Sequence, residues 1–323
     1  MKITRSGLAA LSLLLCAPAL SAADTPYPTK PIRLVVPFAA GGPSDVIARI
    51  IAPKLSDVLG QSVIIDNRAG AGGTIGVGNV ANSAPDGYSL VNVGPGPIVV
   101  SPYIAKTSYD PTKDLIPISQ VAEVPVAIVA SPKFAPGTFP ELVAYAKANP
   151  GKVTFGSPGA GTLHHLLGEL IKKDLGIDMV HVPYKGAAPA MNGLLSGDVD
   201  IAIVDASGAL PQIKAKTAKL VALTMDKRNA KFPEYPVAAE TGYPSIVGTS
   251  WYGLFAAAKT PPEIVAKLEA ATRRAVADEG VRQRLDSIGV LPADSSSADF
   301  ARFIAKETKV WGTLAKEIGV TLQ

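Results

Sequence analysis

Two glycine-rich segments contain the residues best suited to bind a ligand. "PFAAGGPSD" follows the apolar run "IRLVV", and "GSPGAGT" follows "KVTF". An amphipathic pattern comes next in both cases, so each segment is expected to form the turn from a strand into a helix. The first backbone N–H groups of a helix lack partners and can bind anions without Lys or Arg. The two segments therefore predict a site for a ligand with a carboxylate at one or both ends.

The first segment allows two interpretations that can hold together. Ser44 and Asp45 stand where the helix should begin, so Ser44 can cap it and Asp45 can complement the helix dipole. Alternatively, Gly41, Gly42 and Ser44 donate hydrogen bonds to a ligand carboxylate, because glycines let a ligand approach the backbone closely.

The second segment has the same design. Thr162 can cap the helix that carries His164 and His165. Adjacent helix residues point in different directions, so the two histidines cannot form a metal pair. We expect one of them to face the core or the cleft that would hold the ligand, and the other to face solvent. The candidate ligand contacts in this segment are Gly156, Ser157, Gly159, Ala160, Gly161 and Thr162.

Three further places could line the same cleft. Asp205 ends the strand-like run "VDIAIVD". It either caps the next segment or accepts hydrogen bonds from a ligand hydroxyl, amine or protonated acid. Residues 94–97 form a third candidate loop, and Tyr184 either lines the cleft or packs between domains.

Motifs of the common enzyme classes are missing from the sequence. A relaxed dinucleotide match starts at Gly76, but a glycine-rich loop precedes it where a strand is required. The phosphate-binding G-x-x-x-x-G-K-[ST] and the hydrolase G-x-S-x-G do not occur. A hydrolase that uses Ser157, His164 and Asp205 is the remaining catalytic alternative. We expect a protein that is not an enzyme and that needs no cofactor and no metal.

The elements that would position these residues alternate along the chain. Strand-like runs such as "IRLVVPF" and "QSVIIDN" alternate with helix-like runs such as "SDVIARIIAPKLSDVLG". Repeated β-α-β units predict α/β domains with mainly parallel sheets, where ligands bind at the carboxyl ends of strands. Because the two glycine-rich turns share one plan, we expect two domains that each offer one turn.

The N-terminus and the composition predict an exported protein. Lys2 and Arg5 precede an apolar run at residues 8–15, and small residues follow, as in a signal peptide over residues 1–23. The run is shorter than the roughly 20 residues that span a bilayer. Cys16 is the only cysteine, and its lipidation is a lesser alternative. The formal charge of +4 is scattered, so no nucleic-acid footprint is expected.

Four segments together resemble one receptor family. They are "YPTKPIRLVVPFAAGGPSDVIAR", "VIIDNRAGAGGTIGVGNVANSAPDGYSL", "TFGSPGAGTLHHLLGE" and "HVPYKGAAPAMNGLLSGDVDIAI". In order and spacing they resemble the Bug-type periplasmic solute receptors, the TctC-like substrate-binding proteins of tripartite tricarboxylate transporters. The resemblance covers nearly all of the chain after the predicted signal peptide.

This resemblance implies an α/β, two-domain periplasmic-binding-protein (Venus flytrap) fold with a hinge and an interdomain ligand cleft. We expect residues 24–123 plus 230–323 to form domain 1 and residues 124–229 to form domain 2. The resemblance also implies a periplasmic location, a di-/tricarboxylate or aromatic acid as ligand, and delivery to membrane permease subunits. Presentation of the bound carboxylate to a membrane sensor kinase is the alternative.

The resemblance places the ligand contacts in two loops, residues 38–45 and 156–164, partly through ordered water. "GPGPIVVSPYI" is unusually rich in Pro and Gly where the family varies. The class of site therefore carries over better than the identity of the ligand. The expected ligand-binding residues are Phe38, Ala40, Gly41, Gly42, Ser44, Asp45, Gly94, Gly96, Ser157, Gly159, Ala160, Gly161, Thr162, His164, Tyr184 and Asp205.

Overall fold

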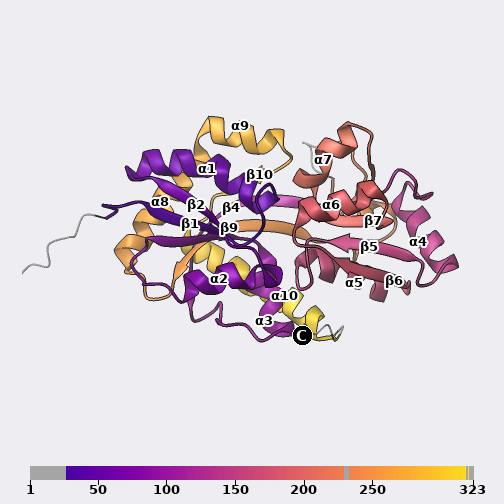
Figure 1. Cartoon of the computed structure of the whole chain (residues 1–323), viewed down its shortest axis with the longest axis horizontal. Coiled ribbons are helices and arrows are strands. Elements are labelled where there is room, and N and C mark those ends of the chain that lie inside the picture. Colours follow the sequence, from indigo (N-terminus) through magenta and orange to yellow (C-terminus); the bar gives the residue numbers. More distant parts are fainter. Residues whose placement is uncertain (1–26, 229–232, 318, 320–323) are drawn as a thin grey trace, which may run out of the picture.

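Two lobes lie side by side along the long axis of the molecule (Figure 1). The structure is a computed structural model that describes residues 27–228, 233–317 and 319. Within these residues, no helix has the length and apolar character needed to cross a membrane. The predicted signal peptide and Cys16 lie outside the described residues.

The first lobe is built from both ends of the described chain. Its N-terminal elements are β1 (Ile32–Val36), α1 (Pro43–Leu59), β2 (Val63–Asn67), η1 (Ala71–Gly73), α2 (Thr74–Ala81), β3 (Ser89–Val93), η2 (Gly96–Val100) and α3 (Ser101–Ile104). Its C-terminal elements are β9 (Thr249–Ala257), α8 (Pro262–Ala277), α9 (Glu279–Ser287), β10 (Leu291–Pro292) and α10 (Ser297–Glu317).

The second lobe is built from the middle of the chain, which enters it through the long strand β4 (Leu115–Ala130). Its elements are α4 (Phe139–Ala148), β5 (Val153–Ser157), α5 (Leu163–Leu175), β6 (Met179–Pro183), α6 (Ala187–Ser196), β7 (Ile201–Asp205), α7 (Ala206–Lys214), β8 (Lys219–Leu223) and η3 (Ala238–Thr241).

One path of paired strands crosses both lobes in the order β2-β1-β3-β9-β4-β7-β5-β6, and β8 and β10 also pair with β4. β1 is parallel to β2 and β3, and β5 is parallel to β6 and β7. These two parallel groups are the β-α-β units that the sequence predicts. The antiparallel strands β9 and β4 lie between the groups and connect them.

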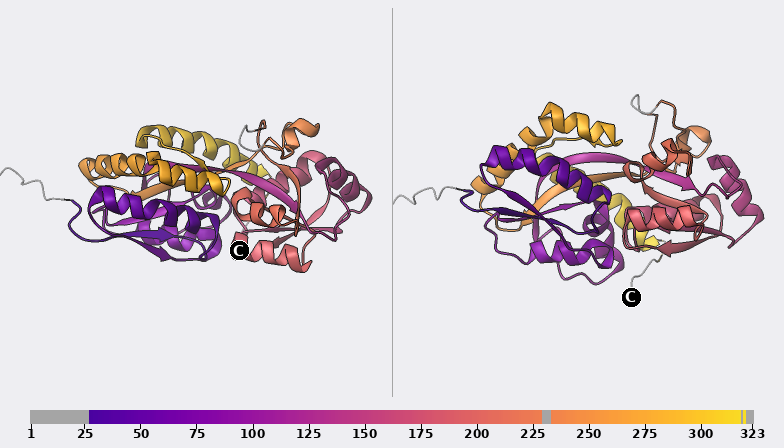
Figure 2. Two further views of the ribbon diagram at one scale, coloured as in Figure 1. Left: turned by 90° about the horizontal axis from the view of Figure 1, so that it is seen from above. Right: turned by 45° about the horizontal axis from the view of Figure 1, so that its top comes forward.

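β4 changes partners along its length. Residues 115–125 pair with β9, and residues 126–130 pair with β7 and β8. The two views of Figure 2 show the lobes as separate bodies with strands running between them. The boundaries that we expect between the domains, at residues 123–124 and 229–230, remain a prediction.

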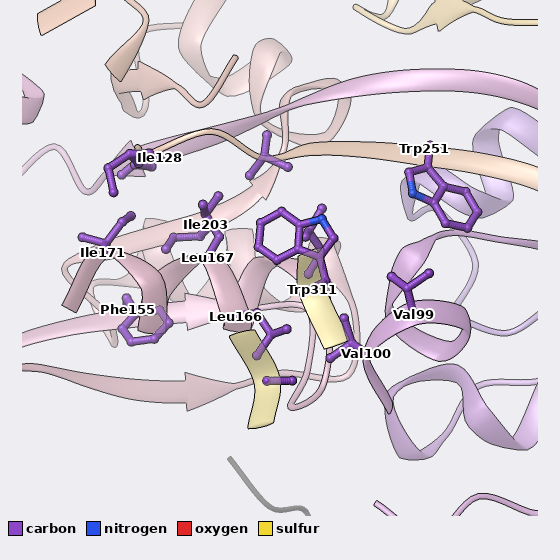
Figure 3. Close-up of a cluster of buried hydrophobic side chains, with 14 of the residues drawn as sticks. Val99, Val100, Ile128, Phe155, Leu166, Leu167, Ile171, Ile203, Trp251 and Trp311 are labelled. Atoms are coloured by element: carbon purple, nitrogen blue, oxygen red, sulfur yellow. The ribbon is translucent and has the colours of Figure 1, made fainter. Parts of the chain in front are cut away.

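A hydrophobic core continues from one lobe into the other (Figure 3). Trp251 and Val99 of the first lobe belong to the same buried cluster as Phe155 and Leu167 of the second, and Trp311 of α10 joins them. Each fully buried Val, Leu or Phe side chain in this cluster stabilises the fold by about 1.5–3 kcal/mol. Two smaller clusters fill the space beneath α1, α8 and α9 and beneath α6 and α7.

The ends of α1 and α5 decide where the two glycine-rich turns lie. Pro43 already occupies the first position of α1, so Ser44 lies inside the helix and the predicted Ser44 cap is wrong. The Oγ atom of Ser44 instead donates to the backbone oxygen of Asn92, at 2.9 Å. Asp45 is in the first turn, as predicted. Thr162 does cap α5, because its Oγ1 atom accepts a hydrogen bond from the backbone N–H of His165.

Candidate functional site

A small cavity, here called the inner cavity, lies between the lobes and has a volume of about 50 Å³. The loops after β1, β3, β5 and β6 line it, together with the end of β7 and two residues of β9. It brings together nine of the predicted site residues: Phe38, Ala40, Gly42, Ser44, Gly94, Gly96, Thr162, His164 and Asp205.

Several helices begin at the wall of the inner cavity. Gly42 starts α1, Thr162 starts α5 and Gly186 starts α6, and Asp205 is the N-terminal flanking residue of α7. Each of these ends carries unpaired N–H groups and a partial positive charge. Among the described residues that line the cavity there is no Lys or Arg. The wall can therefore bind an anion through backbone groups.

Asp205 accepts hydrogen bonds from both lobes. Its Oδ1 atom lies 2.7 Å from Nε2 of His164 on α5, and its Oδ2 atom accepts from the hydroxyl of Tyr252 on β9. Burial, and then the charge of Asp205, raises the pKa of Tyr252 well above its ordinary value, so Tyr252 keeps its proton. The side chain of Asp205 makes no capping hydrogen bond to α7, so the capping interpretation is wrong.

A second polar cluster, whose residues do not line the inner cavity, supports the turn before α5. The Oγ atom of Ser157 lies 2.7 Å from Nε2 of His181, whose ring stacks on His165 at 3.9 Å between centroids. The N–H of Gly161 donates to Nδ1 of His165 at 3.2 Å. Burial lowers the pKa of His181 to about 3 and that of His165 to about 4, so both rings are neutral near pH 7.

Both histidines of α5 are buried, and the expectation that one of them faces solvent is wrong. His164 lines the inner cavity, and His165 packs against His181. The first turn of α5 is enclosed on both sides, which the helical spacing alone cannot reveal. The possible catalytic group is not assembled either, because His164 contacts Asp205 whereas Ser157 contacts His181.

The first loop depends on Asp45. Its Oδ2 atom accepts from the N–H of Gly41 at 2.9 Å and from Nε of Arg49 at 2.8 Å, and its Oδ1 atom accepts from Nδ2 of Asn67 at 2.9 Å. Burial opposes ionisation, but these hydrogen bonds outweigh burial and lower the pKa of Asp45. Gly41 has a φ of 84°, which favours glycine. Gly41 and Asp45 shape the loop and line neither cavity.

A larger outer cavity of about 650 Å³ shares Phe38 and Pro158 with the inner cavity. Three predicted site residues line only this outer cavity: Gly159, Ala160 and Tyr184. Lys106 and Lys185 also line it. Ser157 and Gly161 line neither cavity. The predicted site residues thus fall into three groups. Some line the inner cavity, some line the outer cavity, and some line neither and support the loops.

The two lobes touch along the line of the glycine-rich loops. A Cβ atom added to Gly72 would lie 2.8 Å from the backbone oxygen of Ala160. A Cβ atom added to Gly96 would lie 3.2 Å from Cα of Thr162. Glycine at these two positions allows the loops to approach each other this closely.

Some cavity residues were not predicted from the sequence, notably residues 186–189, Ser250 and Tyr252. Ser250 and Tyr252 are polar residues two positions apart in the apolar strand "TSWYGLFAA". Residues with this spacing share one face of a strand, and this signal could have indicated them. Within the described residues, no group of three His, Cys, Asp or Glu side chains is placed to hold a metal ion.

The chain is similar to one known family along most of its length. The model of the tripartite tricarboxylate transporter family receptor, TctC, matches residues 47–320. Protein BugT of Bordetella pertussis (strain Tohama I) is 36% identical over 303 residues, which cover 93% of this chain and 93% of BugT. A "UPF0065 protein in gbd 5'region" of Cupriavidus necator is 37% identical over 321 residues, which cover 98% of this chain and 97% of that protein.

Solved structures of similar proteins have the same fold. Periplasmic binding protein BugD has a TM-score of 0.86 at 35% identity, covering 92% of this chain and 100% of BugD. R. palustris Rpa4515 with adipate has a TM-score of 0.87 at 33% identity, covering 91% and 99%. MatC from Rhodopseudomonas palustris with bound malate has a TM-score of 0.84 at 32% identity, covering 90% and 100%.

These findings confirm the resemblance and the two-domain periplasmic-binding-protein fold that the sequence predicts. A histidine kinase sensor domain, 14% identical with a TM-score of 0.50 over 81% of this chain and 97% of that domain, shares the fold alone. The family consists of solute receptors and not of enzymes, as expected. The chain therefore belongs to the tripartite tricarboxylate transporter receptor (TctC) family, as a solute-binding receptor of the Bug type.

Proposed function

We propose that this receptor captures a small carboxylate in the inner cavity and delivers it to the membrane subunits of a tripartite tricarboxylate transporter. The observation that carries this proposal is the meeting of α1 and α5, one from each lobe, at a cavity whose described wall contains no Lys or Arg. Helix N-termini in such an arrangement favour an anion. Two relatives, R. palustris Rpa4515 with adipate and MatC with bound malate, are consistent with a carboxylate.

Closure of the lobes would link binding to delivery. Each lobe supplies part of the set of N–H donors, so the full set surrounds a ligand only when the loops meet. A ligand that makes more hydrogen bonds in the closed form shifts the population toward that form. The transporter would then recognise the closed receptor. This role requires the periplasm, and the predicted signal peptide at residues 1–23 would provide export.

Calorimetry and thermal shift with aliphatic and aromatic mono-, di- and tricarboxylates test the binding. Saturable heat and a raised melting temperature are expected for at least one class. The absence of any response across the panel would contradict the proposal.

Gly42→Val tests the place of binding. Gly42 lines the inner cavity, and a Cβ atom there would meet only the backbone oxygen of Ala39, at 3.6 Å. Added side-chain atoms should therefore lower the affinity for the acid with a modest loss of stability. Unchanged affinity would remove this loop from the site.

Deletion of the gene tests delivery. If the receptor serves a transporter, the deletion should abolish uptake of the bound acid. Normal uptake combined with lost gene induction by that acid would instead support the sensor-kinase alternative.

A further inference from the structure

Four residues of the inner cavity form what we call the polar wall: His164, Asp205, Ser250 and Tyr252. His164 is 6% exposed and Ser250 is 1% exposed. Within the described part of the chain, Nδ1 of His164 and Oγ of Ser250 have no hydrogen-bond partner. Buried polar atoms almost always have partners. These two atoms therefore point to a ligand group.

The hydrogen bonds of Asp205 decide what the polar wall offers. An ionised carboxylate can only accept, so Nε2 of His164 carries the proton in the pair with Oδ1. This leaves Nδ1 as the ring nitrogen that is open to a ligand. The hydroxyl of Tyr252 donates its hydrogen bond to Oδ2 of Asp205. The wall then presents the free nitrogen of His164 together with two acceptors, the remaining lone pairs of Asp205 and the hydroxyl of Ser250.

The charges around the inner cavity favour the binding of one ligand carboxylate and disfavour a second carboxylate on the same ligand. The helix N-termini can hold one anionic group, but Asp205 already places a carboxylate in the wall. Two carboxylates that share a small site repel each other. Lys106 and Lys185 line the outer cavity and not the inner one. An ammonium group beside Asp205 would instead form a charge-assisted hydrogen bond.

We infer that the polar wall binds a hydroxyl or ammonium group of the ligand. The preferred solutes are then hydroxy- or amino-substituted monocarboxylates, ahead of unsubstituted monocarboxylates and of dicarboxylates. The inference rests on the proposed function, because the helix N-termini must hold the carboxylate while the polar wall holds the second group. The volume of about 50 Å³ suits a group of a few atoms, since one water needs about 10–15 Å³.

Calorimetry at pH 7 with two matched series tests the inference. The first series is propanoate, 3-hydroxypropanoate, β-alanine and malonate. The second is benzoate, 4-hydroxybenzoate, 4-aminobenzoate and terephthalate. In the series that fits the cavity, the hydroxy or amino member should bind about tenfold more tightly, or better, than both the unsubstituted acid and the dicarboxylate.

Asp205→Asn should remove most of this advantage of the hydroxy or amino member over the unsubstituted acid. Asp200→Asn is the matched control. Asp200 precedes the same strand, β7, and its Oδ2 atom accepts from N and Oγ1 of Thr154 at 2.8 and 2.9 Å. This control should keep the ranking of the wild-type protein. Circular dichroism checks that each variant is folded. If Asp205→Asn fails to fold, the order in which the wild-type protein binds the acids still tests the inference.

The outcomes separate the two claims. If malonate or terephthalate binds as tightly as the hydroxy and amino members, the inference is wrong and the carboxylate receptor stands. Equal binding of the unsubstituted acids would also overturn the inference. If no acid in either series binds, the inference is wrong, and the proposed function is then decided by the wider panel of mono-, di- and tricarboxylates.

Discussion

Single carboxylates organise both loops of the inner cavity. The side chain of Asp45 accepts a hydrogen bond from the N–H of Gly41 and so orders the first loop. The side chain of Asp205 is hydrogen-bonded to His164, next to the second loop. A carboxylate accepts several hydrogen bonds at once, so each one orients donors from separate parts of the chain. The types of these residues were evident from the sequence, but their partners were not.

Asp45→Ala should lower the free energy of unfolding by about 2–3 kcal/mol, because Gly41, Arg49 and Asn67 lose a buried, charged acceptor. Urea denaturation measures the change. Asp57→Ala is the control, since Asp57 is exposed on the same helix and should change stability by less than about 0.5 kcal/mol. Equal effects of the two variants would show that the contacts of Asp45 contribute little.

The buried histidines predict a dependence of stability on pH. The pKa values of His181 and His165 are about 3 and about 4 in the folded protein, against about 6.5 when unfolded. The unfolded chain therefore binds more protons at intermediate pH. This contribution to stability is complete above about pH 6.5 and is lost as the pH falls toward 4 and then 3.

His181→Phe tests this dependence. Phenylalanine can still stack in the same place but cannot titrate, so the fall in the urea midpoint between pH 7 and pH 5 should be smaller than in the wild-type protein. A variant with the same pH slope as wild type would rule out His181 as a source of the effect.

Helices and strands position the site through packing that periodicity predicts only in part. The strands before both turns and the helices after them were predicted because apolar residues recur with the right spacing. The short helix α2 was not predicted, because its glycines lower helix propensity. A Cβ atom on Gly76 would lie 2.7 Å from Cβ of Pro37, so close packing explains that glycine.

The parts of the site that the sequence did not indicate come from long-range pairing. Tyr252 reaches the cavity because β9 pairs with both β3 and β4, which lie far away in the sequence. The start of α6 faces the same cavity as the start of α5 for a similar reason. Neither relation leaves a pattern within a short window of residues.

Gly168→Ala tests the packing of α5 on its sheet. A Cβ atom there would lie 2.2 Å from Cε2 of Phe155 on β5, so the variant should lose about 1–3 kcal/mol of stability. Gly208→Ala in α7 is the control, because the nearest atom would be 3.9 Å away. This control should be neutral or stabilise by up to about 1 kcal/mol. Thermal unfolding that ranks the two variants the other way would contradict the packing argument.

On the scale of the whole molecule, the lobes are joined by several of the described elements. β4 and β9 run between them, and α10 contacts α5 of the second lobe. An ion pair of 2.9 Å between Lys173 and Glu317 adds to the contact of α10 with α5. The glycine-rich loops meet at a separate place, so closure can be altered there while these connections remain.

Gly96→Ala should shift the receptor toward a more open form. The added methyl group would press against Thr162 of the other lobe, while the helical backbone of Gly96 tolerates alanine. Small-angle X-ray scattering should show a larger radius of gyration, and ligand affinity should fall several-fold. Gly208→Ala again serves as the control. Wild-type scattering curves for Gly96→Ala, with and without ligand, would show that the loop contact does not limit closure.

The environment of Glu307 gives the protein an internal optical reporter. The chain has two tryptophans, and Nε1 of Trp251 and of Trp311 donate to Oε2 of Glu307 at 3.3 and 3.2 Å. Trp251 precedes Tyr252 of the polar wall, and Trp311 belongs to α10. We expect the intrinsic fluorescence to change when a ligand moves the lobes, because indole emission responds to a nearby carboxylate and to water. Ligand binding could then be followed in unlabelled protein.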